Sequence, residues 1–107
     1  LNYYLFNGNV DLRKGIFRLC ESIREEMSLD PSDASNVYMF MSRNRKVVKI
    51  LHYERGFYVL YEKRPDMGKF KKPVFDEVSR CYRIQWSDMA YLTESIVVDK
   101  MYVSPKG

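Results

Sequence analysis

Cysteine and histidine are scarce in this chain of 107 residues, which holds two cysteines and one histidine. Cys20 and Cys81 are too few for a disulfide framework. His52 has no second histidine and no close cysteine pair with which to form a metal site of the usual nitrogen and sulfur type. We therefore expect no metal and no cofactor, a buried thiol at Cys20, a structural role for His52 and a reduced, cytoplasmic setting.

Glycine-rich loops and long apolar runs are missing as well. Gly56 and Gly68 stand alone, so no loop is suited to cradle a phosphate. Neighbouring acids such as Glu25 and Glu26 have the pattern of a solvated surface, and no serine or cysteine has an activating base close by in the sequence. No apolar run approaches the ~18–20 residues of a membrane span, and no secretory signal is apparent. The sequence predicts a non-enzymatic protein without a membrane segment.

The composition that remains is that of an ordinary globular protein, with 46% apolar and 30% charged residues. This length fits a single domain over residues 1–107. The excess positive charge is confined to residues 43–72, which hold ten bases and three acids, whereas the rest of the chain has a net charge of −3. A concentrated basic segment attracts polyanions. A protein partner, or a surface that is merely solvated, would account for the same charge.

The first third of the chain predicts a strand over residues 3–6 and then an amphipathic helix. Asp11 is the expected N-cap. The apolar stripe that follows has helical spacing and consists of Leu12, Ile16, Leu19, Cys20, Ile23 and Met27. Arg13 and Lys14 would then lie at the positive end of the helix dipole, where a bound anion would relieve the repulsion. Pairing of these bases with Asp11 is the alternative.

The remaining elements predict an α+β domain. Alternating apolar residues indicate strands over 37–41, 46–53 and 57–63, and their short connections favour an antiparallel meander. Residues 64–77 read as an irregular basic connection. A short strand over 82–85, a helix from Trp86 with Ser87 as its cap, and a final strand over 97–98 or 101–103 complete the chain. We expect a single small domain in which an antiparallel meander sheet carries an N-terminal amphipathic helix and a second, short C-terminal helix.

Several segments, read in order, resemble one family. They are Asp11-Leu12-Arg13-Lys14-Gly15, Asp30-Pro31, Val37-Tyr38-Met39-Phe40 with Arg43-Asn44-Arg45, Val48-Lys49-Ile50-Leu51 with Glu54-Arg55-Gly56-Phe57, the block from Lys63 to Phe70, and Trp86. The chain resembles the small Orf2-like accessory proteins, often labelled TnpB, that are encoded beside the transposase in bacterial insertion-sequence-66 elements. It departs from the family pattern at Ile16, Tyr53 and Glu62 and in the turn before Gly56.

The resemblance implies a protein that is needed alongside the transposase for efficient transposition. It does not imply strand-transfer chemistry, which belongs to the separate large transposase. The implied partners are the transposase, the other accessory proteins of the element, and DNA, with the element ends as the expected target. The implied location is the bacterial cytoplasm, with nucleoid association when DNA is bound.

The meander predicts where the bases gather. The turn over 43–46 and the end of the third strand at 63–64 fall at the same end of an up-down-up sheet, and the connection over 69–72 leaves from there. This basic edge is expected to contact phosphates, and Arg43, Asn44 and Arg45 are expected to reach base edges in a groove. The expected nucleic-acid-binding residues are Arg43, Asn44, Arg45, Lys46, Lys49, Arg55, Lys63, Arg64, Lys69, Lys71 and Lys72.

Two alternatives use the apolar groups of the sheet instead. An adapter for the transposase complex, without direct DNA binding, would use the aromatic face of Tyr38, Phe40, Tyr58 and Leu60, unless the C-terminal helix covers that face. A binder of single strands or RNA would stack bases on Tyr53 and Tyr58 beside Lys49.

Overall fold

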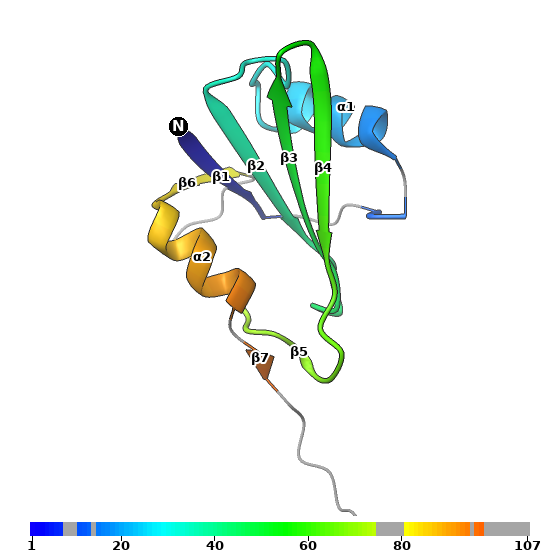
Figure 1. Ribbon diagram of the computed structural model, residues 1–107, viewed down its shortest axis with the longest axis vertical. Coiled ribbons are helices and arrows are strands. Elements are labelled where there is room, and N and C mark those ends of the chain that lie inside the picture. Colours follow the sequence, from blue (N-terminus) through cyan, green and yellow to red (C-terminus); the bar gives the residue numbers. More distant parts are fainter. Residues whose placement is uncertain (8–10, 14, 75–80, 95, 98–107) are drawn as a thin grey trace, which may run out of the picture.

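The computed structural model describes residues 1–7, 11–13, 15–74, 81–94 and 96–97. Its main sheet has five strands in the order β4-β3-β2-β1-β6 (Figure 1). The elements are β1 (Asn2–Phe6), α1 (Ile16–Glu26), β2 (Asn36–Met41), β3 (Val48–Glu54), β4 (Phe57–Lys63), β5 (Lys69–Phe70), β6 (Cys81–Ile84), α2 (Trp86–Glu94) and β7 (Ile96–Val97). β5 and β7 pair in a separate two-stranded sheet. The end of the expected basic connection at residues 75–77 and the alternatives for the last strand beyond residue 97 lie outside the described residues.

The meander is confirmed for β2, β3 and β4, but the expectation of a wholly antiparallel sheet is wrong. β1 runs parallel to β2, with Tyr3 opposite Val37, and β6 pairs with the other side of β1 in the antiparallel sense. The tight connections between β2, β3 and β4 force antiparallel neighbours. The chain between β1 and β2 is long enough to cross over the sheet through α1, and this crossover permits the parallel pair. The fold is therefore a small α+β domain with a mixed sheet.

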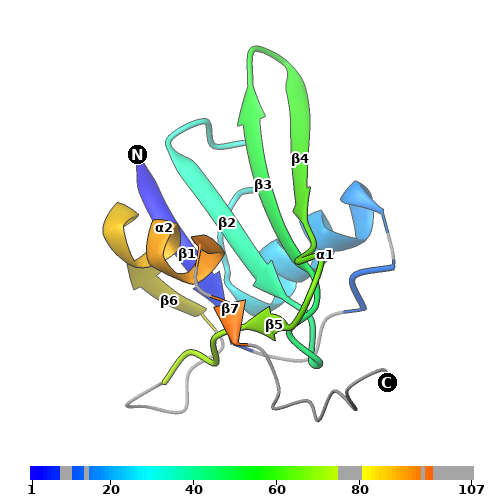
Figure 2. The ribbon, with the colours of Figure 1, turned by 60° about the horizontal axis from the view of Figure 1, so that its bottom comes forward.

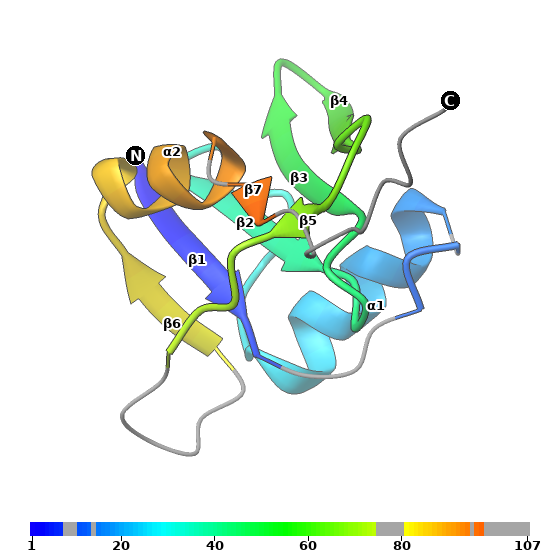
Figure 3. The same ribbon diagram turned by 90° about the horizontal axis from the view of Figure 1, so that it is seen from below.

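Other elements pack on both faces of the sheet. α1 packs on one face, and α2 with β5 and β7 lies over the other (Figures 2 and 3). Tyr38 and Phe40 of β2 point into the α1 layer, whereas Met39 points into the α2 layer, and all three are fully buried. β2 has a nearly continuous apolar sequence because both of its faces are in the interior.

This arrangement corrects the expected adapter surface. The face that carries Tyr38 and Phe40 is covered by α1 and not by the C-terminal helix. Tyr58 and Leu60 on the same face are half-buried against the α1 layer. The four side chains form part of the core and offer no open aromatic face to a partner.

The capping residue of each helix differs from the sequence expectation, although α2 begins at Trp86 as expected. Gly15 is the N-cap of α1 and makes no side-chain capping bond. Asp11 instead accepts hydrogen bonds from the backbone N–H and the guanidinium of Arg13, each at 3.0 Å. At α2, Asp88 accepts a 3.0 Å hydrogen bond from the backbone N–H of Gln85, so this acid, and not Ser87, secures the first turn.

Cys20 and His52 have the structural roles expected of them, and Tyr38 has one that the sequence did not predict. Cys20 is fully buried with a free thiol, which confirms that prediction, and burial raises its pKa. His52 Nε2 lies 3.0 Å from the carbonyl oxygen of Ala34. The Tyr38 hydroxyl donates to the carbonyl oxygen of Asp30 at 2.8 Å and accepts from the Asn36 amide at 3.0 Å. Burial raises the pKa of Tyr38 to about 12.

The buried phenol predicts a loss of stability at high pH. An unfolded tyrosine ionises near pH 10, whereas Tyr38 in the fold ionises near 12, so its contribution is complete below pH 10 and is lost as pH rises toward 12, by at most about 3 kcal/mol. Tyr38→Phe should lose about 1–2 kcal/mol at pH 8, because Asp30 and Asn36 each lose a partner. The variant should then lose less than the wild type between pH 8 and 11.5 in urea unfolding.

Comparing the wild type with Tyr38→Phe separates the contribution of Tyr38 to the pH dependence of stability from the contributions of other groups. Burial also raises the pKa of Cys81, to about 11, but this thiol is present in both proteins and contributes equally. The same loss of stability above pH 10 in the wild type and in Tyr38→Phe would contradict the assignment to Tyr38.

Candidate nucleic-acid interface

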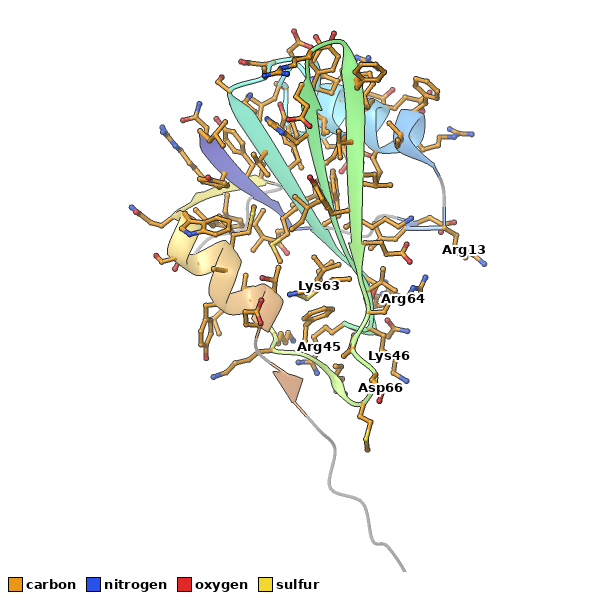
Figure 4. All side chains as sticks on the ribbon, in the orientation of Figure 1. Arg13, Arg45, Lys46, Lys63, Arg64 and Asp66 are labelled. Carbon is orange, nitrogen blue, oxygen red and sulfur yellow. The ribbon has the colours of Figure 1, made fainter. Side chains whose placement is uncertain are left out.

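Basic side chains from the β2–β3 turn, the end of β4 and the segment around β5 gather at one end of the main sheet. Met41 at the end of β2 lies opposite Val48 at the start of β3, and Val48 lies opposite Lys63 at the end of β4. The β2–β3 turn and the segment after β4 therefore leave the sheet side by side (Figure 4). We call this the basic end and define it by Arg43, Arg45, Lys46, Lys63, Arg64, Lys69, Lys71 and Lys72.

The β2–β3 turn is held by its own polar side chains. Asn44 Oδ1 accepts hydrogen bonds from Ser42 Oγ at 2.8 Å and from the backbone N–H of Lys46 at 3.1 Å. These bonds compete with the base-reading role expected for Asn44, because a contact with adenine uses both the oxygen and the nitrogen of the amide. Asn44 therefore stabilises the turn that carries Arg43, Arg45 and Lys46.

A backbone hydrogen bond ties β5 to the same turn. Arg45 has a left-handed backbone (φ 60°), and its carbonyl oxygen accepts the N–H of Phe70 at 2.7 Å. The Phe70 side chain is 1% exposed in the core under α2. The connection that carries Lys69, Lys71 and Lys72 is thereby anchored to the β2–β3 turn.

Two bases of the basic end are paired with acids. Lys63 Nζ lies 2.9 Å from Glu94, and Arg64 Nε lies 2.8 Å from Glu62. The hydrogen bond from Arg64 is the main reason why the pKa of Glu62 is lowered. All four side chains are at least 41% exposed, and exposed pairs contribute about 0.2–1 kcal/mol each. A phosphate can therefore compete for Lys63 and Arg64 at small cost.

A hollow of about 350 Å³ lies where β1, β2 and the connection after β5 meet. Its lining includes Arg43, Arg45 and Lys72, and none of the described residues that line it is acidic. A second hollow, of about 610 Å³, lies beside α2 and also includes Lys72 in its lining. The bases around the first hollow suit an anionic group better than a neutral one.

Lys49 does not belong to this surface, contrary to the expectation. Only 8% of it is exposed, and its Nζ donates to the carbonyl oxygen of Leu12 and lies 3.5 Å from Glu62 Oε1. The alternation of β3 places Lys49 on the same face as Leu51, toward α1. Lys49 is therefore an internal bridge between β3, β4 and the segment before α1.

Arg55 and Arg13 also lie away from the basic end. Arg55 occupies the β3–β4 turn at the opposite end of the sheet, where its backbone is left-handed (φ 50°). Arg13 lies beside the start of α1 and is paired with Asp11, the alternative considered from the sequence (Figure 4). Lys14 lies outside the described residues.

Some neighbours of the basic end could not be found from the sequence. Lys71 Nζ lies 2.8 Å from the Tyr91 hydroxyl and 5.4 Å from the centre of that ring. Arg83 of β6 lines the larger hollow together with these two residues. These contacts join elements that are far apart in the chain, so no local sequence pattern predicts them.

The expected platform for single strands is not open in this arrangement. The rings of Tyr53 and Tyr58 pack edge to face, with centroids 4.9 Å apart. Lys49, the third member of that constellation, is buried.

Over the described part of the chain, no cluster of three or more histidine, cysteine, aspartate or glutamate side chains is placed to hold a metal ion. No helix among the same residues is both long and apolar enough to cross a membrane.

Fold and site together define a small α+β domain with a mixed sheet and a strongly basic end. A family model described as IS66 Orf2-like protein matches residues 1–102. The chain therefore belongs to the IS66 Orf2-like family, as the sequence resemblance indicated, and this membership indicates an accessory role in transposition. No curated protein and no solved structure matches the chain.

Proposed function

We propose that this protein is a non-catalytic accessory factor of insertion-sequence transposition that binds duplex DNA through its basic end. The observation that carries the proposal is the strand register, in which Met41 lies opposite Val48 and Val48 opposite Lys63. This register brings the β2–β3 turn and the segment after β4 to the same end of the sheet. The basic end has eight bases, and the acids beside it among the described residues are Glu62, Asp66 and Glu94. The charge of this set is strongly positive even after these three acids are counted.

Phosphate contacts are the main source of affinity in this proposal. Exposed lysine and arginine side chains release counterions when they meet phosphates, which gives affinity without reading the sequence. Lys46 is exposed, Lys63 and Arg64 exchange their weak intramolecular pairs for phosphates, and the hollow lined by Arg43 and Lys72 accepts a further phosphate. The protein would hold DNA for the transposase, which supplies the chemistry and is the proposed protein partner.

The cytoplasm is the proposed location, with association to the nucleoid through DNA. An adapter role without DNA contact has less support, because the aromatic face that suggested it is part of the core.

A salt-titrated binding assay tests the proposal. The purified protein is compared on a duplex of the element's terminal inverted repeat and on an unrelated duplex of equal length. With about four to six phosphate contacts, affinity should fall roughly 10²–10³-fold between 50 and 200 mM salt on both duplexes. Absence of binding at 50 mM salt, or an affinity that does not respond to salt, would refute DNA binding by the basic end.

A further inference from the structure

β4 forms an edge of the main sheet, and no described strand pairs with its outer side. Its register with β3 is unbroken over seven pairs, from Val48–Lys63 to Glu54–Phe57. Edge strands are usually shielded by proline, a bulge or a lysine within the strand. β4 contains no proline, and its only lysine, Lys63, is its last residue. This edge is therefore open to pairing with another strand.

Exposed aromatic side chains accompany the open edge. Phe57 is 71% and Tyr61 60% exposed, and Val59 lies between them on the face turned away from α1. The α2 layer packs on β1, β2 and β3 and leaves this part of the face uncovered among the described residues. An apolar strip along an unpaired edge strand is typical of an interface.

We propose that β4 pairs antiparallel with β4 of a second copy of this chain, about a two-fold axis at Val59. Arg55 and Gly56 have positive φ values and form a two-residue hairpin turn that the pair Glu54–Phe57 closes. Alternation along an antiparallel ladder then directs the backbone N–H and C=O groups of Tyr58, Leu60 and Glu62 outward. In the proposed register, Tyr58 and Leu60 of one copy form hydrogen-bonded pairs with Leu60 and Tyr58 of the other.

The side chains of β4 suit pairing with an identical strand. In this register Phe57 lies opposite Tyr61 of the second copy, Tyr61 opposite Phe57, and Val59 opposite itself. These positions fall between the hydrogen-bonded pairs, where side chains approach most closely. Aromatic and β-branched pairs are favourable in such positions. The apolar strip therefore covers itself, which favours a second copy over an unrelated partner.

The charges at the ends of the paired strands are mixed. Lys63 and Arg64 of one copy come close to the β3–β4 turn of the other, which carries Glu54 and Arg55. Contact of Arg64 with Glu54 is favourable and contact of Lys63 with Arg55 is unfavourable, although Lys63 is already paired with Glu94 of its own chain. One strand pair buries less area than the ~1,200–2,000 Å² of a standard interface. The dimer should therefore be weak, with a dissociation constant of roughly 10–100 µM.

The residue on the two-fold axis provides a sharp test by sedimentation equilibrium between about 5 µM and 1 mM protein. The wild type should be a concentration-dependent dimer. Val59→Lys and Val59→Glu should each weaken dimerisation at least tenfold, because like charges then face each other at the axis. An equimolar mixture of the two variants should dimerise again, because lysine then faces glutamate.

The control variant is Leu1→Lys, which places a charge directly before β1 at a side chain that is 70% exposed, and β2 and β3 separate β1 from β4 in the sheet. It should dimerise like the wild type, and circular dichroism should show all variants folded. Restored dimerisation in the mixture cannot arise from misfolded chains, so it supports the register directly. A monomeric wild type at 1 mM, equal effects of Val59→Lys and Leu1→Lys, or no recovery in the mixture would overturn the proposal.

Discussion

Replacing Lys46, Lys63 and Arg64 by alanine should weaken duplex binding roughly 10²–10³-fold near 0.1 M salt. Each phosphate contact that is lost removes about 0.9 from the slope of log affinity against log salt, so the slope should become shallower by about 2–3. The three side chains are exposed and contribute only weak ion pairs to the fold. The free energy of unfolding should change by less than about 1 kcal/mol. Fluorescence anisotropy over a series of salt concentrations measures both the affinity and the slope.

A matched variant separates the basic end from net charge. Replacing Arg13, Arg18 and Arg24 by alanine removes the same three charges from the region of α1, and these side chains are also exposed. If the basic end makes the contacts, this control should lose less than about fivefold in affinity and keep the wild-type slope. Equal losses in the two variants would mean that DNA responds to the overall field of the protein and not to this end of the sheet.

The strands of the meander were predictable because the information for them is local. Alternating apolar residues over 37–41, 46–53 and 57–63 gave three strands, and the structure has them at Asn36–Met41, Val48–Glu54 and Phe57–Lys63. Their short connections fixed the antiparallel order, and that order alone predicts that the turn over 43–46 and residues 63–64 share one end of the sheet. The convergence of these bases was therefore accessible from the sequence.

The position of β1 was not predictable in the same way. Residues 3–6 indicate a strand, but no local pattern states which strand it joins or in which direction. The parallel pair with β2 is selected by packing of the crossover helix α1 on the sheet. The pairs of Lys63 with Glu94 and of Lys71 with Tyr91 likewise depend on where α2 lies, which is a tertiary property.

The strand alternation around Lys49 indicated a buried position, but its charge suggested a place among the DNA-binding residues. It alternates in phase with Leu51, so the strand period already placed it on the α1 face. A lysine can extend its amine along apolar surface to an acceptor, and here the amine reaches the Leu12 carbonyl and approaches Glu62. The face of the sheet on which a basic residue lies therefore decides whether its side chain can reach a ligand.

Phe70 anchors the basic connection, so its truncation should have the largest effect on stability. Phe70→Ala should lower the free energy of unfolding by about 3–5 kcal/mol, because a fully buried ring is lost and a cavity remains. Phe70→Leu, which keeps most of the volume, should cost only about 1–1.5 kcal/mol. Urea unfolding at low temperature, where the alanine variant stays folded, measures both values. A loss below 1 kcal/mol for Phe70→Ala would show that the β5 segment is not docked in solution.

The same pair of variants connects the core to DNA binding without removing any charge. The Phe70 ring and its backbone N–H hold the connection against Arg45, and this contact keeps Lys69, Lys71 and Lys72 beside the β2–β3 turn. When the ring is lost, those lysines sample many positions and their ordering opposes binding. Folded Phe70→Ala should therefore bind a duplex about tenfold more weakly than the wild type, with Phe70→Leu close to the wild type. If the alanine variant is destabilised but binds normally, the lysines of the connection contribute no contacts, and binding depends on the turn over 43–46 and on Lys63 and Arg64 alone.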